Sequence, residues 1–400
     1  MVTQASDIYY DPYSVEIDKD PYPLWRRMRD EAPLYYNEHF NFYALSRYED
    51  VRAVSMAPRQ FLSGHGTVLE MMTEDLNDFP ILLWTDPPVH DSQRRLVSRA
   101  FTPKRVAQLE PWIRELCASL AAEIYERRSV DFLQDFAAQI PSRVISQLVG
   151  VEPEDREAIR LTIDESFYLD PETGQNNPIS QAASARLREY LSNLRDERIK
   201  NPKDDLMSAL VSVEMDFDDG EGPQRLGPDH IVAFVNEITA AGTETVARML
   251  GWAAVLLERN PDQRRLLASD RSLLHGCVEE TLRYEPPSAV QARYVAEEVE
   301  FYGTTLPVGT RLLALTGSAG RDDRVYEDSD RYDITRPTDR HLSFGLGVHF
   351  CLGASLARLE GRIALDELLN KIPDWEIDYD NAVRLHTSTV RGYHHLPFSF

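Results

Sequence analysis

The chain has 400 residues, 42% of them hydrophobic, which suffices for a large core in one extended domain or two closely packed ones. Its formal net charge of -23 argues against nucleic acid as the main partner. The start of the chain lacks the basic and apolar regions of a secretory signal, and no stretch approaches the roughly 20 apolar residues of a membrane-spanning helix. Three cysteines at no metal-finger spacing predict neither disulfides nor zinc, so we expect a cytoplasmic protein without a membrane anchor.

Helical periodicity accounts for most of the expected elements. In chain order, the sequence predicts a short strand at 42–45, helices at 103–128, 142–149, 184–200 and 205–213, a surface loop at 216–228, a long helix at 230–259, a helix at 272–284, strands at 298–302 and 311–314, and a helix at 354–369. The long helix follows the expected N-cap Asp229 and ends before Pro261. At 1.5 Å per residue it would span roughly 45 Å and cross the whole molecule.

A cysteine in a glycine-rich loop is the sharpest local feature. Cys351 lies in Phe344-Gly345-Leu346-Gly347-Val348-His349-Phe350-Cys351-Leu352-Gly353, directly before the last predicted helix. The three glycines permit backbone conformations that side chains forbid, and they let another group approach closely. The start of a helix favours a thiolate over a thiol, and a thiolate is a strong electron donor for a haem iron. The alternative is a buried structural cysteine, which is the common role of a lone cysteine.

These ten residues resemble the haem-binding signature of the cytochrome P-450 family, Phe-x-x-Gly-x-x-x-Cys-x-Gly, in its bacterial form with a His two residues before the Cys. The resemblance implies the cytochrome P-450 fold, mainly α with a small β portion, in which a long oxygen-binding helix and the cysteine-ligand loop enclose haem b. It implies one domain over 1–400, whose β-rich part lies near 30–60, 290–315 and 375–400. Within the loop, Cys351 becomes the iron ligand, and the implied haem contacts are Phe344, Gly345, His349 and Gly353.

The long helix contains a second segment of interest, Ala240-Ala241-Gly242-Thr243-Glu244-Thr245. Gly242 costs about 1 kcal/mol relative to Ala, and Thr hydroxyls bond back to carbonyls, so we expect a local opening of the backbone hydrogen bonds. The segment is similar to the family's oxygen-binding groove, which implies haem contact at Ala241 and Gly242. The resemblance makes Thr245 the alcohol of oxygen activation and Glu244 the acid that relays protons from solvent. An ordinary kinked helix is the alternative.

Two further sets of charged residues occur in the family's order. Glu280 and Arg283 resemble its Glu-x-x-Arg motif, which implies a structural ion pair, with Arg336 as a third member. The two haem propionates need cationic or hydrogen-bonding partners. The implied partners are His90, Arg94, Arg293 and His349. For any one of them, a surface charge is the commoner explanation.

A local basic run stands out in this acidic chain. From 92 to 109 there is no acidic residue, whereas Arg94, Arg95, Arg99, Lys104 and Arg105 all occur. We hypothesise that the run forms part of a docking face for an acidic electron donor of the ferredoxin type. Part of it would serve the propionates instead.

The segments that contact substrate in the family fall on apolar parts of this chain. They are 67–84, which includes Phe79 and two Met residues, Ala240 and Ala241, 289–291, and 389–390. Such a pocket suits a medium-sized hydrophobic molecule, although each segment could be plain core. Asn236 and Glu237 are polar one turn before the groove, and we hypothesise that one of them hydrogen-bonds a substrate hydroxyl or amine. Terpenoid, steroid, fatty acid and polyketide substrates stay open.

The leading hypothesis is a haem-dependent monooxygenase that inserts one atom of O2 into a hydrophobic organic substrate, by hydroxylation in the family's commonest outcome. Electrons would come from a ferredoxin and its reductase, and we expect a monomer. One alternative is a peroxide-driven peroxygenase, against which the Glu244–Thr245 pair speaks, because peroxide-driven relatives tend to replace it. The other is a haem-binding sensor or carrier, against which an intact oxygen groove speaks.

Overall fold

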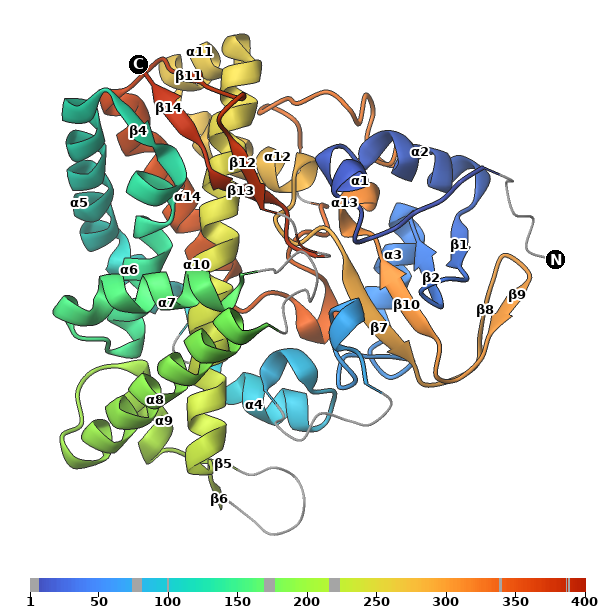
Figure 1. The fold of residues 1–400 in the computed structure, drawn as a ribbon, viewed down its shortest axis with the longest axis horizontal. Helices are drawn as coiled ribbons and strands as arrows, with labels where there is room; N and C mark the ends of the chain where they lie inside the picture. The colour runs from blue at the N-terminus through green and yellow to red at the C-terminus, as the bar shows by residue number, and fades with distance from the viewer. Residues whose placement is uncertain are drawn as a thin grey trace.

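The computed structural model describes residues 7–73, 81–98, 101–168, 177–215, 224–337, 340–385, 387 and 389–400. Helices occupy most of these residues and gather on one side of the molecule, with a strand-rich part on the other (Figure 1). The predicted fold class, mainly α with a small β portion, is confirmed. Of the expected loop at 216–228, residues 216–223 lie outside the described ranges. No helix among the described residues is long and apolar enough to cross a membrane.

The long predicted helix is α10 (Pro228–Arg259), which crosses the molecule from end to end (Figure 1). Its N-cap is Gly227 rather than the expected Asp229, because Pro228 takes the first helical position, where its missing N–H costs nothing. The helix ends at Asn260, as predicted. Nearly all side chains of its second half are buried, so this part of the helix forms the centre of the core.

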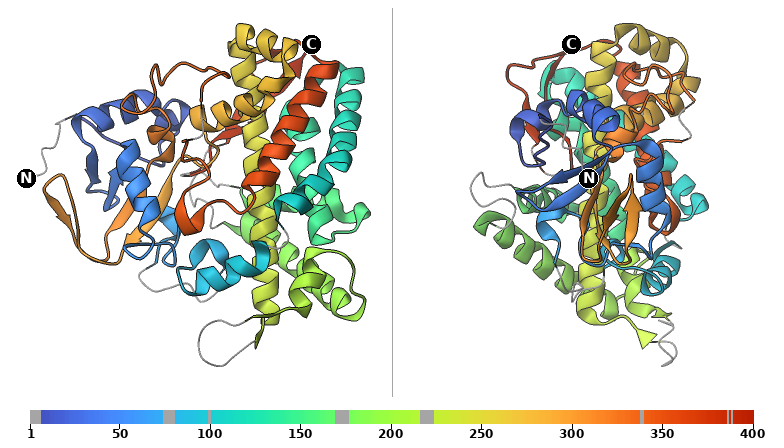
Figure 2. Two further views of the ribbon diagram at one scale, coloured as in Figure 1. Left: turned by 180° about the vertical axis from the view of Figure 1, so that it is seen from behind. Right: turned by 90° about the vertical axis from the view of Figure 1, so that its right-hand side faces the viewer.

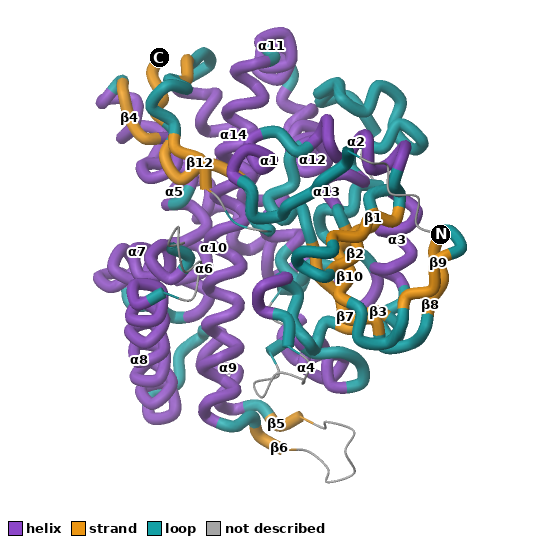
Figure 3. Tube along the Cα trace, turned by 45° about the vertical axis from the view of Figure 1, so that its right-hand side comes forward, coloured by secondary structure: helices purple, strands orange, loops and turns teal. Residues whose placement is uncertain are grey.

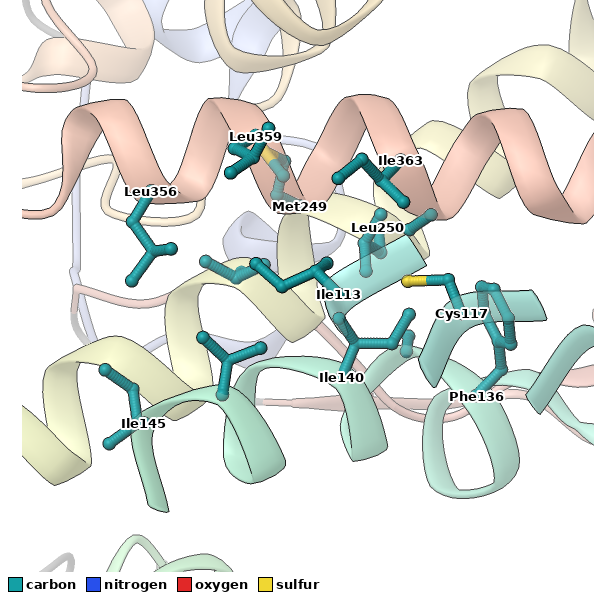
Figure 4. Packing of buried hydrophobic residues seen from close by; sticks show 14 of the residues in the cluster. Ile113, Cys117, Phe136, Ile140, Ile145, Met249, Leu250, Leu356, Leu359 and Ile363 are labelled. Atoms are coloured by element: carbon teal, nitrogen blue, oxygen red, sulfur yellow. The ribbon is translucent and has the colours of Figure 1, made fainter. Parts of the chain in front are cut away.

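Two helices, α6 (Gln139–Val149) and α14 (Ala354–Lys371), pack along α10, and α5 (Pro103–Arg127) packs along α14. Seen from behind, α14 runs beside α10, and α5 runs beside α14 (Figure 2). Figure 4 shows their apolar side chains interlocking, with Leu356 of α14 and Ile145 of α6 at one end of the cluster. Because α14 begins three residues after Cys351, this packing fixes where the cysteine loop emerges.

The remaining helices complete the helical part and flank the strands. Most of those that bury a face against neighbours show 3.6-residue periodicity, which the sequence predicted at 184–200, 205–213 and 272–284. These helices are α1 (Val15–Lys19), α2 (Tyr22–Glu31), α3 (Tyr48–Met56), α4 (Val89–Ser98), α7 (Arg156–Ser166), α8 (Pro178–Lys200), α9 (Leu206–Ser212), α11 (Pro261–Ser269), α12 (Leu274–Tyr284) and α13 (Thr316–Ala319).

The main sheet joins strands from two distant parts of the chain. Its order is β1 (Leu34–Asn37), β2 (Phe42–Leu45), β10 (Arg311–Ala314), β7 (Gln291–Val295) and β3 (Phe61–Leu62). β10 runs parallel to β2 and antiparallel to β7, with Leu312 opposite Arg293. Figure 3 shows these strands gathered away from α10. The sheet therefore carries Arg293 on its β7 strand.

Short strands complete the structure. β14 (Pro397–Ser399) pairs with both β11 (Glu376–Ile377) and β4 (Ser129–Asp131), which brings the C-terminal strand to the residues after α5. The short strands are β4 (Ser129–Asp131), β5 (Glu214–Met215), β6 (Gln224–Arg225), β8 (Val299–Phe301), β9 (Thr304–Leu306), β11 (Glu376–Ile377), β12 (Val383–Leu385), β13 (Gly392–His395) and β14 (Pro397–Ser399).

Candidate active site

The cysteine loop is folded tightly over residues 344–353. The backbone N–H of Cys351 donates to the carbonyl oxygen of Phe344 at 2.7 Å, which closes the loop. Gly345 and Gly347 adopt positive φ angles of 66° and 67°, which side chains disfavour. Gly353 does not share this conformation, and a Cβ there would meet no protein atom within 4 Å. Two of the three glycines therefore shape the turn, whereas the third leaves space beside the cysteine.

The Cys351 thiol is solvent-accessible but surrounded by protein. Burial raises the pKa of the thiol, while the backbone N–H groups of Gly353 and Ala354 and the cations Arg94 and Arg358 act in the opposite direction. A metal ion bound to the sulfur would lower the pKa of the thiol further and favour the thiolate, as these two N–H groups and two arginines already do.

A network of charged side chains contacts Phe344, the first residue of the cysteine loop. Glu279 of α12 accepts two hydrogen bonds from Arg358 of α14, at 2.7 and 2.9 Å, and lies 3.0 Å from His341. Although burial opposes ionisation, His341 and Arg358 lower the pKa of Glu279 to about 2. The Arg358 guanidinium lies 4.5 Å from the centre of the Phe344 ring, a cation–π contact. Neither Glu279 nor Arg358 was predicted as a site residue, and their signal was only their position on helices beside the loop.

Two of the predicted propionate partners are in contact with each other, with their rings tilted by 60°. The rings of His90 and His349 lie 4.4 Å apart. Burial, followed by the neighbouring His349, lowers the pKa of His90. His349 also lies 3.6 Å from Asp86, a carboxylate that was not predicted as a site residue. Burial opposes ionisation of Asp86, but His349 and the N–H groups of Ser63 and Gly64 lower its pKa.

The other two predicted partners, Arg94 and Arg293, have no carboxylate within ion-pair distance among the described residues. Burial lowers the pKa of Arg94, and it lowers that of Arg293 to about 10. Asp86 acts on Arg293 only through a longer-range attraction. Buried cations without an ion-pair partner fit the carboxylates of a dianionic cofactor. Together with an accessible thiol among N–H donors, this arrangement fits a haem with its propionates.

The predicted oxygen segment presents small side chains at the middle of α10. Ala241 is exposed although α10 crosses the centre of the molecule, and the Thr245 hydroxyl donates to the carbonyl of Ala241 at 2.9 Å. The expected opening of the backbone ladder is wrong, because the α-helix is continuous here. Gly242 serves packing instead, since a Cβ there would lie 2.6 Å from Cγ1 of Ile145.

Glu244 and Thr245 are neighbours in sequence, but no hydrogen bond joins their side chains. The Glu244 carboxylate is buried and forms an ion pair with Arg248, one turn further along α10. Arg248 also donates to the carbonyl of Tyr393 at 2.6 Å. In this conformation, Glu244 therefore faces away from the Thr245 hydroxyl, toward residues that were not predicted.

The Glu280–Arg283 pair is completely buried, and Arg336 joins it at 3.4 Å. Arg283 also donates to the carbonyl oxygens of Gly320, Ser329 and Arg331. The three charged residues are brought together as expected. They tie α12 to the turn-rich segment before the cysteine loop.

The segments that were expected to contact substrate lie close to one another: 289–291 lies beside 389–390 and near Leu69. The N–H of Ala289 donates to Thr389, Ser288 pairs with Val390, and Leu69 packs with Val290 in one apolar cluster. Phe79 lies outside the described residues. Glu237 accepts the N–H groups of Leu82 at 3.0 Å and Leu83 at 2.7 Å, so it holds this turn rather than lying free in a pocket.

Known proteins match this chain in sequence and in structure over nearly its whole length. A family model described as cytochrome P-450 matches residues 174–383. The chain is 41% identical to cytochrome P-450 123 of Mycobacterium tuberculosis, covering 98% of this chain and 97% of that protein. It is 35% identical to vitamin D(3) 25-hydroxylase of Pseudonocardia autotrophica, covering 99% and 98%. The solved structure of CYP109Q5 from Chondromyces apiculatus superposes with a TM-score of 0.86 at 30% identity, covering 98% and 97%.

Proposed function

The chain belongs to the cytochrome P-450 family and is a haem-dependent monooxygenase, and we propose that Cys351 would bind the iron of a haem b. The single observation that carries the assignment is the accessible Cys351 thiol among two backbone N–H groups and two arginines. In this proposal, His90, Arg94, Arg293 and His349 bind the propionates. Phe344, Gly345, Gly353, Ala241 and Gly242 would contact the haem.

The bound haem supplies the activation of O2, which with two electrons and two protons converts a C–H bond to C–OH and releases water. The chain's own residues orient the substrate and deliver the protons. Thr245 stands on the accessible face of α10, where its hydroxyl can hand on a proton. Glu244 must turn from Arg248 toward Thr245 to act as the proton donor.

We further propose that an acidic ferredoxin supplies the electrons. Arg95, Lys104 and Arg105 are exposed, and they lie on α4 and α5, next to Arg94 and its neighbour Cys351. Arg99 lies outside the described residues. Charge reversal at Arg95 and Arg105 should slow reduction by a ferredoxin at low salt, measured by stopped flow. Reduction rates unchanged with every acidic donor would contradict the docking face.

The proposed substrate is a hydrophobic small molecule that is hydroxylated. The vitamin D(3) hydroxylase acts, by its name, on a large apolar molecule, and this similarity supports a substrate of that class. Sterol-like and macrolide compounds should be screened for the spin-state shift that follows displacement of water from the iron. Product formation is then compared between a surrogate ferredoxin system and hydrogen peroxide alone. Turnover with peroxide only would favour the peroxygenase alternative.

We also propose that the enzyme is cytoplasmic and monomeric, and that residues 1–400 form one haem domain.

A further inference from the structure

A recess with a volume of about 270 Å³ lies where three helical parts of the chain meet, apart from the candidate active site. Its walls come from α5, α14 and the short turn η5 (Arg271–Leu273) with the start of α12. The residues of α14 that line it begin at Leu359, more than two helical turns beyond Cys351. None of the residues predicted to contact haem or oxygen lines this recess.

Three arginines from different elements line the recess: Arg114 of α5, Arg271 of η5 and Arg362 of α14. His275, in the first turn of α12, lines it as well. No side chain caps the N-terminus of α12, so its partial positive charge lies on the same side. Each guanidinium presents a rigid fork of N–H donors that matches an oxyanion. The recess therefore directs positive charge inward from three elements.

The carboxylates near the recess gather on one of these arginines. Nη1 of Arg114 donates to Asp366 at 2.8 Å and to Glu367 at 2.7 Å. The same guanidinium lies 3.8 Å from Glu110. Arg114 therefore holds the acids, and the pairing leaves the other two arginines without a close partner.

Arg271 and Arg362 keep donors that the protein does not use. Nε of Arg271 lies 3.8 Å from Asp366, beyond hydrogen-bond distance, and its buried Nη1 has no hydrogen-bond partner. The Arg271 side chain is 31% exposed, so a turn of the guanidinium brings this donor to the recess. Arg362 is exposed and donates from Nε to the carbonyl of Arg358 at 3.3 Å, and among the described residues no carboxylate lies within ion-pair distance of it. A buried N–H group without an acceptor is costly, so an acceptor from outside the chain would stabilise this arrangement.

We propose that the recess binds a phosphate dianion between the guanidinium groups of Arg271 and Arg362, with the His275 imidazole beside them. A phosphate group offers at least three acceptor oxygens, which two arginines on separate elements can share, whereas a carboxylate offers two oxygens in one plane. The volume admits inorganic phosphate or the phosphate group of a small ester. Bound phosphate would join η5 to α14, the helix that begins three residues after Cys351. This site goes beyond the proposed function and does not depend on it.

The first test is equilibrium dialysis of the holoenzyme against radiolabelled inorganic phosphate at constant ionic strength. We expect saturable binding of one phosphate per chain. Arg271→Gln and Arg362→Gln should each weaken the affinity by about tenfold or more, since each removes a charged hydrogen-bond donor. Arg265→Gln is the matched control, because it removes an exposed arginine of α11 that does not line the recess, and it should bind like the parent. Binding that does not saturate, or that is unchanged in both recess variants, would overturn the proposal.

Thermal unfolding of the holoenzyme gives a second readout, because a ligand that binds only the folded state raises Tm. Phosphate should raise Tm more in the parent and in Arg265→Gln than in the double variant Arg271→Gln/Arg362→Gln. The part of the rise that the double variant retains is the general effect of the salt. Glycerol 3-phosphate distinguishes the source of the phosphate, since a larger rise than with inorganic phosphate would assign the site to an ester. An equal rise in parent and double variant, or an equal rise with acetate at the same ionic strength, would contradict a phosphate site.

Discussion

At the scale of single residues, the site is defined by groups whose charge is not balanced by the protein. Arg293 on β7 is partly buried without an ion-pair partner among the described residues, and burial lowers its pKa to about 10. Arg391 is buried but binds Asp18 at 3.1 Å and Glu285 at 2.9 Å. The first arrangement is costly without a ligand, while the second is satisfied within the protein.

Arg293→Leu should therefore stabilise or leave unchanged the haem-free protein, but weaken haem binding in the holoenzyme. The haem-free protein should be equally or more stable, by up to about 2 kcal/mol, because a buried unpaired charge is removed. The holoenzyme should lose haem faster, measured by transfer to apomyoglobin. Arg391→Leu, the control, should destabilise the haem-free protein by about 3 kcal/mol or more. Equal destabilisation by both changes in urea unfolding would contradict a ligand-directed role for Arg293.

Glu360 on α14 is a second unbalanced group, buried with an Oε2 atom that has no hydrogen-bond partner. Burial raises its pKa from 4.5 to about 8. The folded protein thus holds a proton that the unfolded chain releases, so stability falls as the pH rises from 4.5 through 8. Glu360→Gln should match the parent near about pH 5 and exceed it by about 2–4 kcal/mol near about pH 9. A stability difference that does not change with pH in urea unfolding would show that the carboxyl ionises without penalty.

At the scale of elements, periodicity predicted the helices that bury one clear face. The expected 103–128, 205–213 and 272–284 lie within two residues of α5, α9 and α12 at each end. β2 and β10 were predicted with their observed bounds. α7, with its Arg160 and Asp164, was missed because those two charged residues sit on its buried side, where an apolar pattern would be expected. Arg248, the ion-pair partner of Glu244, was missed for the same reason, because it is a charged residue in the core.

In α10, the opening of the helix that was predicted at Gly242 does not occur. Gly242 weakens an isolated helix, yet here it admits Ile145 of α6, and packing keeps the helix continuous. Gly242→Ala should destabilise the protein by about 1–2 kcal/mol, since overpacking outweighs the gain in helix propensity. In an Ile145→Ala background the same change should be neutral or stabilising. A cost that is equal in both backgrounds, by chemical denaturation, would locate the strain elsewhere.

At the scale of the whole molecule, the long-range assembly could be predicted only by resemblance to the family. Periodicity cannot tell that 34–62 and 291–314 share a sheet, because strand pairing depends on contacts distant in sequence. The signature motifs did identify groups that the fold assembles: His90 lies against His349, Arg94 lies near Cys351, and Glu280, Arg283 and Arg336 form one cluster. Partners such as Asp86, Glu279 and Arg358 were missed, since a single charged residue in a sequence is usually at the surface.

The Arg283 cluster should hold the helical part to the segment that leads into the cysteine loop. Arg283→Ala leaves Glu280 buried without its main partner, so we expect a loss of about 3–5 kcal/mol in the free energy of unfolding. The control, Arg26→Ala, breaks a half-exposed pair with Asp323 and should cost less than about 1 kcal/mol. Thermal or urea unfolding measures both. Similar small losses in the two variants would mean that the buried cluster is not a main support of the fold.

The carbon monoxide difference spectrum of the reduced protein tests the central claim most directly. With Cys351 as a thiolate ligand, the Soret band should lie at the strongly red-shifted position that gives the family its name, and Cys351→His should move it to the position typical of histidine-ligated haem. Well-folded protein, produced with a haem precursor, that shows no haem band or a band unchanged by Cys351→His would contradict the account.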